Sequence, residues 1–145
     1  MHTTSNGVAI VPDIYALISN CTFLDMHSDK ANPAVVAVFR EGCVYNFTKC
    51  TFSKCSGFLA GALFLQQYLQ GLNLDRCIFL NNQAQAEDLP EKGNDIYLYH
   101  EDPSEDEKIL DKKIVHCISS SKNKRIGYYW NPSGDEYDKL LLNLE

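Results

Sequence analysis

A short motif that recurs three times in the first half of the chain constrains the fold more than any other feature of the sequence. The motif reads apolar-x-x-Cys-x-Phe, and its cysteines are 29 and then 27 residues apart. The three copies are Ile18–Phe23, Phe47–Phe52 and Leu74–Phe79. A period of a few tens of residues indicates a repeat protein, in which each unit buries its apolar face against its neighbours.

Apolar and polar residues alternate ahead of each cysteine, which is typical of a strand with one buried face. The two polar residues directly before each cysteine predict a tight corner between two short strands. A second apolar run follows each copy and predicts a further strand. These runs are Pro33–Phe39, Gly61–Leu65 and Gly93–Tyr99. Each period therefore contains several short strands separated by turns.

Strands in this arrangement predict an all-β fold: a right-handed parallel β-helix (solenoid) of about three coils with a C-terminal cap. Equivalent residues of successive coils would lie above one another, about 4.8 Å apart. We expect three inward columns, formed by the first apolar residues, the cysteines and the phenylalanines of the motif. Their members are Ile18, Phe47 and Leu74; Cys21, Cys50 and Cys77; and Phe23, Phe52 and Phe79. Free cysteine packs as a small apolar side chain, so the cysteine column is interpreted as core.

The Cys-Thr-Phe corners, the Gly-Ala-Leu-Phe-Leu run and the segment Gly93–Leu98 resemble the repeats of right-handed parallel β-helix proteins. That class includes pectate-lyase-like folds and the repetitive microbial surface proteins related to polymorphic outer-membrane proteins. The resemblance covers about residues 14–99. Such repeats usually carry two glycines before the apolar run and Asn-x-Ala after the Phe, whereas only Asn82 with Ala84 keeps the latter here. The resemblance implies coil geometry and favours an extracellular or cell-surface location, but it implies no shared ligand.

A leucine-rich repeat is the alternative fold, because residues 69–79 fit its consensus and the period lies within its range. That fold needs a helix in the second half of each period, which residues 58–69 could supply. The segment Asn32–Phe39 is instead rich in valine and begins with proline, and Lys92–Asp95 interrupts a helix where one is required. The pattern therefore favours strands.

The whole chain, residues 1–145, is expected to form a single β-helix domain. Residues 1–13 are interpreted as an N-terminal lead-in, 14–99 as the repeat coils, and 100–145 as a charged connector followed by a C-terminal cap. Open solenoid ends expose unpaired strand edges, so the segment Glu136–Glu145 is expected to act as a short amphipathic capping element.

The net charge and the apolar pattern of the chain argue against nucleic acid as a partner and against a membrane span. The formal net charge of −6 disfavours binding to the phosphates of nucleic acids. The longest apolar stretch near the start, residues 7–18, contains Pro12 and Asp13 and is too short to span a membrane. Because the first basic residue is Lys30, the basic region of a signal peptide is not visible either.

No metal, cofactor or catalytic site is predicted. The six cysteines contain no Cys-x-x-Cys pair, and the histidines do not follow at zinc-finger intervals. Cys43 and Cys55 fall outside the motif and are candidates for a disulfide. Acids that could serve an enzyme are isolated, as at Asp25 and Asp75, or lie in a polar insertion, as at Glu87 and Asp88. They are interpreted as surface charges.

One candidate binding patch stands out near the C-terminus, where basic and aromatic residues are interleaved. Its members are Lys122, Lys124, Arg125, Tyr128, Tyr129 and Trp130. Such a patch suits a sugar or an anion. The sequence therefore predicts a non-enzymatic structural or adhesive module, part of a larger surface or extracellular protein, with carbohydrate or another protein as partner. The alternative is a carbohydrate-binding or polysaccharide-cleaving β-helix protein.

Overall fold

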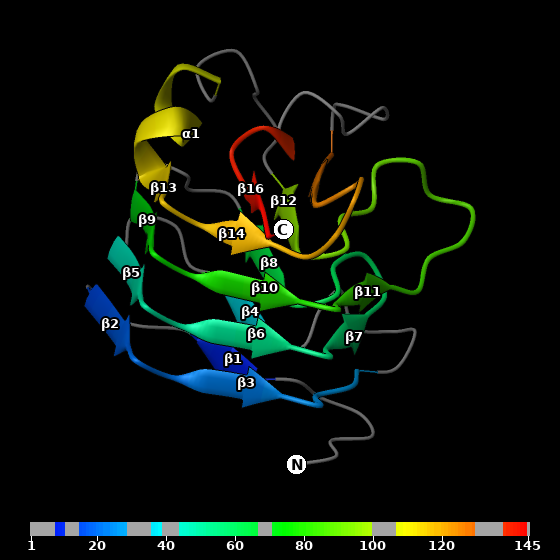
Figure 1. The fold of residues 1–145 in the computed structure, drawn as a ribbon, viewed down its shortest axis with the longest axis horizontal. Helices are drawn as coiled ribbons and strands as arrows, with labels where there is room; N and C mark the ends of the chain where they lie inside the picture. Colours follow the sequence, from blue (N-terminus) through cyan, green and yellow to red (C-terminus); the bar gives the residue numbers. More distant parts are fainter. Residues whose placement is uncertain are drawn as a thin grey trace.

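The computed structural model describes residues 8–10, 15–28, 36–38, 44–66, 71–99, 107–129 and 138–144. Within them the chain forms short strands that all pair in parallel and stack into four sheets, which we name A to D. In Figure 1 the chain crosses the near face from left to right and climbs with each turn, which is a right-handed sense. The structure confirms the predicted parallel β-helix-like solenoid.

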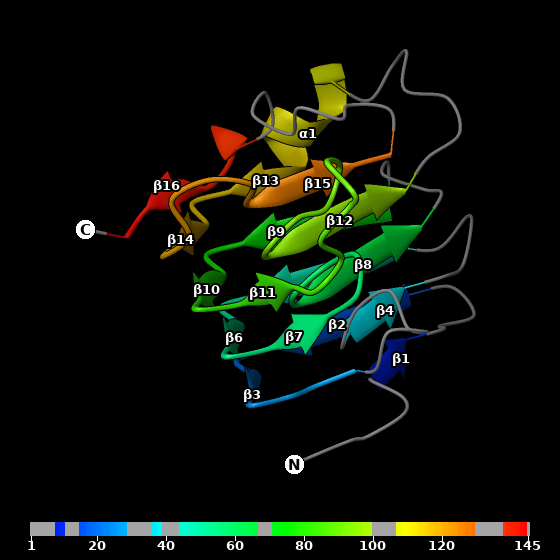
Figure 2. The same cartoon turned by 90° about the vertical axis from the view of Figure 1, so that its right-hand side faces the viewer.

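Sheets A and C each contain five strands, and sheets B and D contain four and two. Sheet A consists of β1 (Val8–Ile10), β4 (Val36–Val38), β8 (Leu63–Gln66), β12 (Ile96–Tyr99) and β15 (Ile126–Tyr128). Sheet B consists of β2 (Tyr15–Ser19), β5 (Val44–Thr48), β9 (Leu72–Asp75) and β13 (Ile114–Val115). Sheet C consists of β3 (Thr22–Leu24), β6 (Thr51–Ser53), β10 (Ile78–Leu80), β14 (Ile118–Ser119) and β16 (Leu142–Asn143). Sheet D consists of β7 (Ser56–Gly57) and β11 (Gln83–Ala84), which lie one above the other between sheets C and A in Figure 2.

The register of the strands places the repeated residues in columns. Phe47 is the partner of Ile18 on one side and of Leu74 on the other. Phe52 likewise lies between Phe23 and Phe79, and its side chain is fully buried. Parallel strands require this in-register stacking if every turn is to present its apolar residues to the same core.

The corners of the turns have a backbone conformation that few side chains adopt. The residue before each motif cysteine has a positive φ, at Asn20, Lys49 and Arg76, and the same holds for His116. A second set of positive φ angles, at Asp25, Lys54 and Asn81, follows the strands of sheet C. Asparagine and aspartate tolerate this left-handed region best. The polar pairs before the cysteines therefore mark corners, as the sequence indicated.

The leucine-rich repeat is not the fold of this chain. Residues 58–66, where that fold would begin its helix, form bends and strand β8 in sheet A. The single helix among the described residues is α1 (Glu107–Lys113), which lies above β13 in Figure 1. Its Leu110 is buried in the core, so part of the predicted charged connector covers the end of the solenoid.

The solenoid extends beyond residues 14–99 at both ends. Strand β1, within the expected lead-in, pairs with β4, and strands β13, β14 and β15 stack on β9, β10 and β12. At the C-terminal end β16 pairs in parallel with β14. We expected an amphipathic segment over Glu136–Glu145 to cap the solenoid. In the structure a short strand of this segment, β16, closes that end.

Candidate functional site

An open groove of about 730 Å³ lies beside sheet D. Residues of three successive turns line it: His27 from the first, Ser56 from the second and Gln83 from the third. His27 and Ser56 form an isolated parallel bridge, and Ser56 is the register partner of Gln83. The groove thus presents a column of polar side chains at the spacing of the turns.

Hydrogen bonds between turns fix the centre of this column. The Nδ1 atom of His27 and the Oγ atom of Ser56 are 2.6 Å apart, a hydrogen bond that either atom can donate according to the imidazole tautomer. Gln85 donates from its Nε2 to the same Oγ over 3.2 Å. Three neighbouring polar groups are therefore held in place before any ligand arrives, which lowers the entropy cost of binding.

The sequence analysis did not single out this column, although the repeat contains its signal. His27 follows Cys21 by six positions, and Ser56 and Gln83 follow Cys50 and Cys77 by the same interval. Residues at equal distance from equivalent cysteines belong to one column when the turns are in register. The three side chains differ in chemistry, being an imidazole, a hydroxyl and an amide, so their equivalent positions in the repeat were not recognised from the sequence.

The outer wall of the groove comes from the polar insertion between β11 and β12. Glu87, Asp88 and Lys92 line the groove from this side, and Lys54 lines it from the corner before β7. The interpretation of Glu87 and Asp88 as charges on the surface agrees with their exposure. Phe58, which is half-buried, adds an aromatic ring to the lining.

A second polar cluster lies inside the solenoid and has Asp95 at its centre. The carboxyl group is fully buried and accepts hydrogen bonds from Asn82 Nδ2 at 3.0 Å and Ser119 Oγ at 2.5 Å. Burial raises the pKa of Asp95 to about 6, while these hydrogen bonds and nearby Arg125 favour the charged form. Asn82 also accepts a hydrogen bond from the backbone of Cys55 and donates to that of Phe52. Asp95 therefore ties the third and fourth turns together, with no access to the groove.

The Gly93-Asn94-Asp95 segment has a structural role at each position. A Cβ atom on Gly93 would lie 1.8 Å from the carbonyl oxygen of Ile96, so the turn leaves no room for a side chain. Asn94 accepts a hydrogen bond from the backbone of Ala84 and donates to the carbonyl of Asn123. These contacts account for the segment without a bound ligand.

The cysteine column has four members and one exposed end. Cys50, Cys77 and Cys117 are fully buried, whereas Cys21 is exposed at the first turn. The prediction that Cys21 is buried with the others is therefore wrong, because the column has no turn beneath it among the described residues. Cys117, which the motif did not include, extends the column by one turn.

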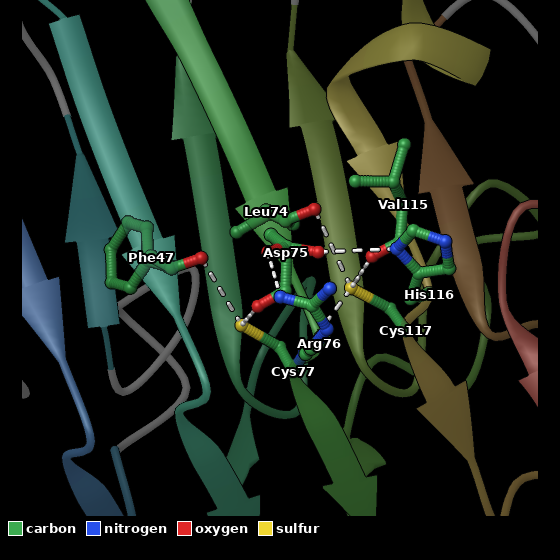
Figure 3. Close-up of polar contacts among 8 residues, drawn as sticks. All are labelled: Phe47, Leu74, Asp75, Arg76, Cys77, Val115, His116 and Cys117. Atoms are coloured by element: carbon green, nitrogen blue, oxygen red, sulfur yellow. Dashed lines mark hydrogen bonds and ion pairs between the residues drawn. The ribbon is translucent and has the colours of Figure 1, made fainter.

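Figure 3 shows how the buried thiols are held. The sulfur of Cys77 donates to the carbonyl oxygen of Phe47, and that of Cys117 donates to the carbonyls of Leu74 and Val115. Burial raises the pKa of the Cys50 thiol. The backbone N–H of Cys77 donates to Cys117 Sγ over 3.4 Å. Contact with the neighbouring Cys117 thiol, together with burial, raises the pKa of Cys77, and contact with Cys77 lowers that of Cys117. These thiols have carbonyl partners and no solvent access, which is typical of core cysteines.

An ionic cluster lies on the outer side of the same corner. Asp75 is 3.1 Å from the guanidinium of Arg76 and 3.2 Å from Nδ1 of His116. Arg76 and His116 are mostly exposed. Such exposed pairs contribute little to stability. The nearby sulfurs face inward and the charges face outward, so Figure 3 contains no nucleophile paired with a base.

The other two cysteines outside the original motif column are Cys43 and Cys55. Cys55 is a buried free thiol whose sulfur donates to the carbonyl of Phe23, and burial raises its pKa. It occupies the position after the second corner, where Asn82 stands one turn later. Cys43 lies outside the described residues. Because Cys55 is a free thiol in this structure, the disulfide between the two that the sequence allowed is not formed.

The predicted basic-aromatic patch does not form one exposed surface. Arg125 and Tyr128 are buried, at 7% and 1% exposure, because the C-terminal segment and the core cover them. Lys122 and Tyr129 are exposed, and Lys124 donates to the carbonyl of Pro90. Trp130 lies outside the described residues.

Arg125 serves the cap and not a ligand. Its guanidinium donates to the carbonyls of Ser121, Asp138 and Leu141 and to the side chain of Asn143. Its backbone N–H donates to the carboxylate of Asp138 over 2.7 Å. One buried cation therefore holds residues 138–144 against the last turn. Sequence reasoning interpreted it as a surface charge because the segment that covers it is distant along the chain.

A metal-binding cluster and a membrane-spanning helix are both absent from the described ranges. No group of three or more histidine, cysteine or acidic residues is arranged to hold a metal ion there. No helix in these ranges is long and apolar enough to cross a membrane. Comparison of the chain with protein-family models, with curated proteins and with solved structures found no match.

Proposed function

We propose that this chain is a non-enzymatic β-solenoid binding module, structural or adhesive, and that the groove beside sheet D is its contact surface. The observation that carries this proposal is the hydrogen-bonded set formed by His27 and Ser56 of the inter-turn column with the neighbouring Gln85. Sites with preordered polar groups on a rigid scaffold suit recognition.

The rigid, repetitive outer surface supports the same proposal. On sheet B, Asn73 donates to the side chain of Asn46 over 2.6 Å, and Asn46 donates to the hydroxyl of Tyr15 over 2.7 Å. Lys113 continues the row with a 3.5 Å contact to Asn73. Such side-chain hydrogen bonds join successive turns along the solenoid axis. Stacked repeats typically bind through extended surfaces that run along the stack.

The resemblance of the repeats to microbial surface proteins related to polymorphic outer-membrane proteins supports an adhesive role at a cell surface. It supports the role through repeat pattern alone. Within the proposal, the chain is part of a larger surface or extracellular protein.

The test is binding without turnover. Purified chain is applied to immobilised extracellular-matrix proteins and glycans, and each retained ligand is then incubated with the protein and analysed for cleavage. We expect retention of at least one ligand class, weakened by Gln85→Ala and unchanged by Ser53→Ala, a control serine on strand β6 of the second turn, outside the groove lining. Cleavage of a retained polysaccharide would contradict the non-enzymatic part of the proposal and favour the polysaccharide-cleaving alternative. Retention that Gln85→Ala leaves unchanged would remove the groove from the proposal.

A further inference from the structure

We infer that the groove beside sheet D binds an uncharged, linear oligosaccharide that lies along the solenoid axis across three turns. The inference rests on the proposed binding function and adds the ligand class and the orientation. It places the sugar site at the sheet D groove and away from the basic-aromatic segment near the C-terminus.

The spacing of the polar groups indicates an extended, repetitive ligand. His27, Ser56 and Gln83 belong to successive turns of a parallel stack, so equivalent backbone positions recur about every 4.8 Å. A ligand that contacts all three must offer hydrogen-bonding groups at a similar interval. A chain of sugar units laid along the axis does so.

The chemistry of the lining matches hydroxyl groups. A sugar hydroxyl both donates and accepts, and it needs partners that do the same. The side-chain amides of Asn81, Gln83 and Gln85 each carry a donor and an acceptor at the groove. The Ser56 hydroxyl, which already contacts His27 and Gln85, keeps one further hydrogen-bonding position. A site whose polar groups are paired by hydroxyls rejects ligands that leave them unpaired.

The charges of the lining favour an uncharged ligand. Lys54 and Lys92 are opposed by Glu87 and Asp88, so the four fixed charges around the groove sum to zero. A polyanion would meet the two carboxylates, and a polycation would meet the two ammonium groups. Either would lose part of its attraction to repulsion within the same groove.

An aromatic surface completes the site. Phe58 lines the groove and is half-buried, so one part of its ring faces solvent. The apolar C–H face of a sugar ring can pack there. The backbone carbonyl of Phe58 accepts a 2.9 Å hydrogen bond from the N–H of Ala86, which holds this part of the backbone beside the insertion.

The experiment uses the full chain and soluble probes. Oligosaccharides of glucose, mannose, galactose and N-acetylglucosamine are titrated while amide chemical shifts are recorded, with oligogalacturonate and heparin-derived oligosaccharides as charged comparators. We expect at least one uncharged oligosaccharide to shift the amides of His27, Ser56 and residues 83–88. We expect Gln85→Ala and Ser56→Ala each to weaken that binding about tenfold, the effect of losing one hydrogen bond.

Ser53→Ala is the matched control, since it removes a hydroxyl of the same turn from sheet C, away from the groove. Each variant is checked for an unchanged strand signal in circular dichroism, and the exposed Gln85 provides a variant that does not disturb the core. Tighter binding of a charged comparator at these residues would overturn the uncharged class. Sugar-induced shifts confined to sheet B or sheet C would overturn the site. If no sugar binds while an immobilised protein ligand does so through Gln85, the ligand class fails and the proposed binding function stands.

Discussion

The ring of Phe52 lies parallel to the ring of Phe79, with 5.0 Å between centroids and 5° between planes. On its other side Phe52 stacks on Phe23 at 4.8 Å and 7°. Phe52→Ala removes the middle ring of this column and leaves a cavity that rigid turns cannot close. We expect a loss of about 3 to 5 kcal/mol in the free energy of unfolding, measured by denaturant titration. Phe23→Ala is the control: its ring is only partly buried, so it should cost less. Equal losses would argue against the column.

Thiol reactivity should follow position along the cysteine column. Cys21 is exposed, whereas Cys50, Cys55, Cys77 and Cys117 are buried. Brief alkylation of the native protein followed by mass spectrometry should label Cys21 before the four buried thiols, which should stay unmodified until the protein unfolds. Burial denies them reagent and, at Cys50 and Cys55, also raises the pKa, which reduces the reactive thiolate. Rapid labelling of Cys77 would contradict its place in the core.

Stability should fall as the pH rises through the range in which Asp95 ionises. Its folded-state pKa is raised to about 6, above the ordinary value of 3.8, so the folded protein binds this proton more tightly than the unfolded chain does. The resulting stabilisation is complete below about pH 4 and is lost as the pH rises through 6. Between pH 5 and pH 7 this carboxyl should remove about 1 kcal/mol from the free energy of unfolding. Asp95→Asn should flatten that part of the profile; an identical slope in the variant would exclude Asp95 as its source.

Arg125→Ala should release the C-terminal cap. The guanidinium makes charged hydrogen bonds to Asp138, Leu141 and Asn143, and we expect a loss of about 2 to 4 kcal/mol when they are removed. Hydrogen exchange should accelerate at the amides of Leu142 and Leu144, which pair with the last turn. Arg125→Lys keeps the charge but lacks the planar fork, so it should give an intermediate effect. Unchanged exchange at Leu142 in the alanine variant would show that other contacts hold the cap.

The turns that share the motif could be predicted from sequence because local pattern and stacking agree there. Alternating apolar residues define the buried face of β5 and β9, and the register pairs Phe47 with Leu74 as the repeat indicates. The fourth turn escaped the motif for two reasons. Ser119 replaces the phenylalanine opposite Phe79, and a longer connector separates Cys117 from Cys77.

The groove and the buried charges depend on contacts that a local pattern does not carry. His27 and Ser56 are in contact because two turns stack. The residues that flank each of them in the sequence do not indicate this contact. From the sequence Arg125 was expected on the surface, but in the structure residues 138–144 cover it. Cys21 is likewise exposed because it lies in the first turn of the stack. Its motif is the same as the motifs of the buried Cys50 and Cys77, so the motif could not predict this difference.

The polar insertion between β11 and β12 lines the proposed binding groove but does not disturb the stacking of the strands. It is longer than the link between β7 and β8, yet Ile96 still pairs with Leu63 in full register. Longer surface links cost little closure entropy. Substitutions at Glu87 and Asp88 could therefore retune what the groove accepts while the aromatic column stays as it is. The same stack of turns could therefore carry a groove wall of different chemistry without losing its stability.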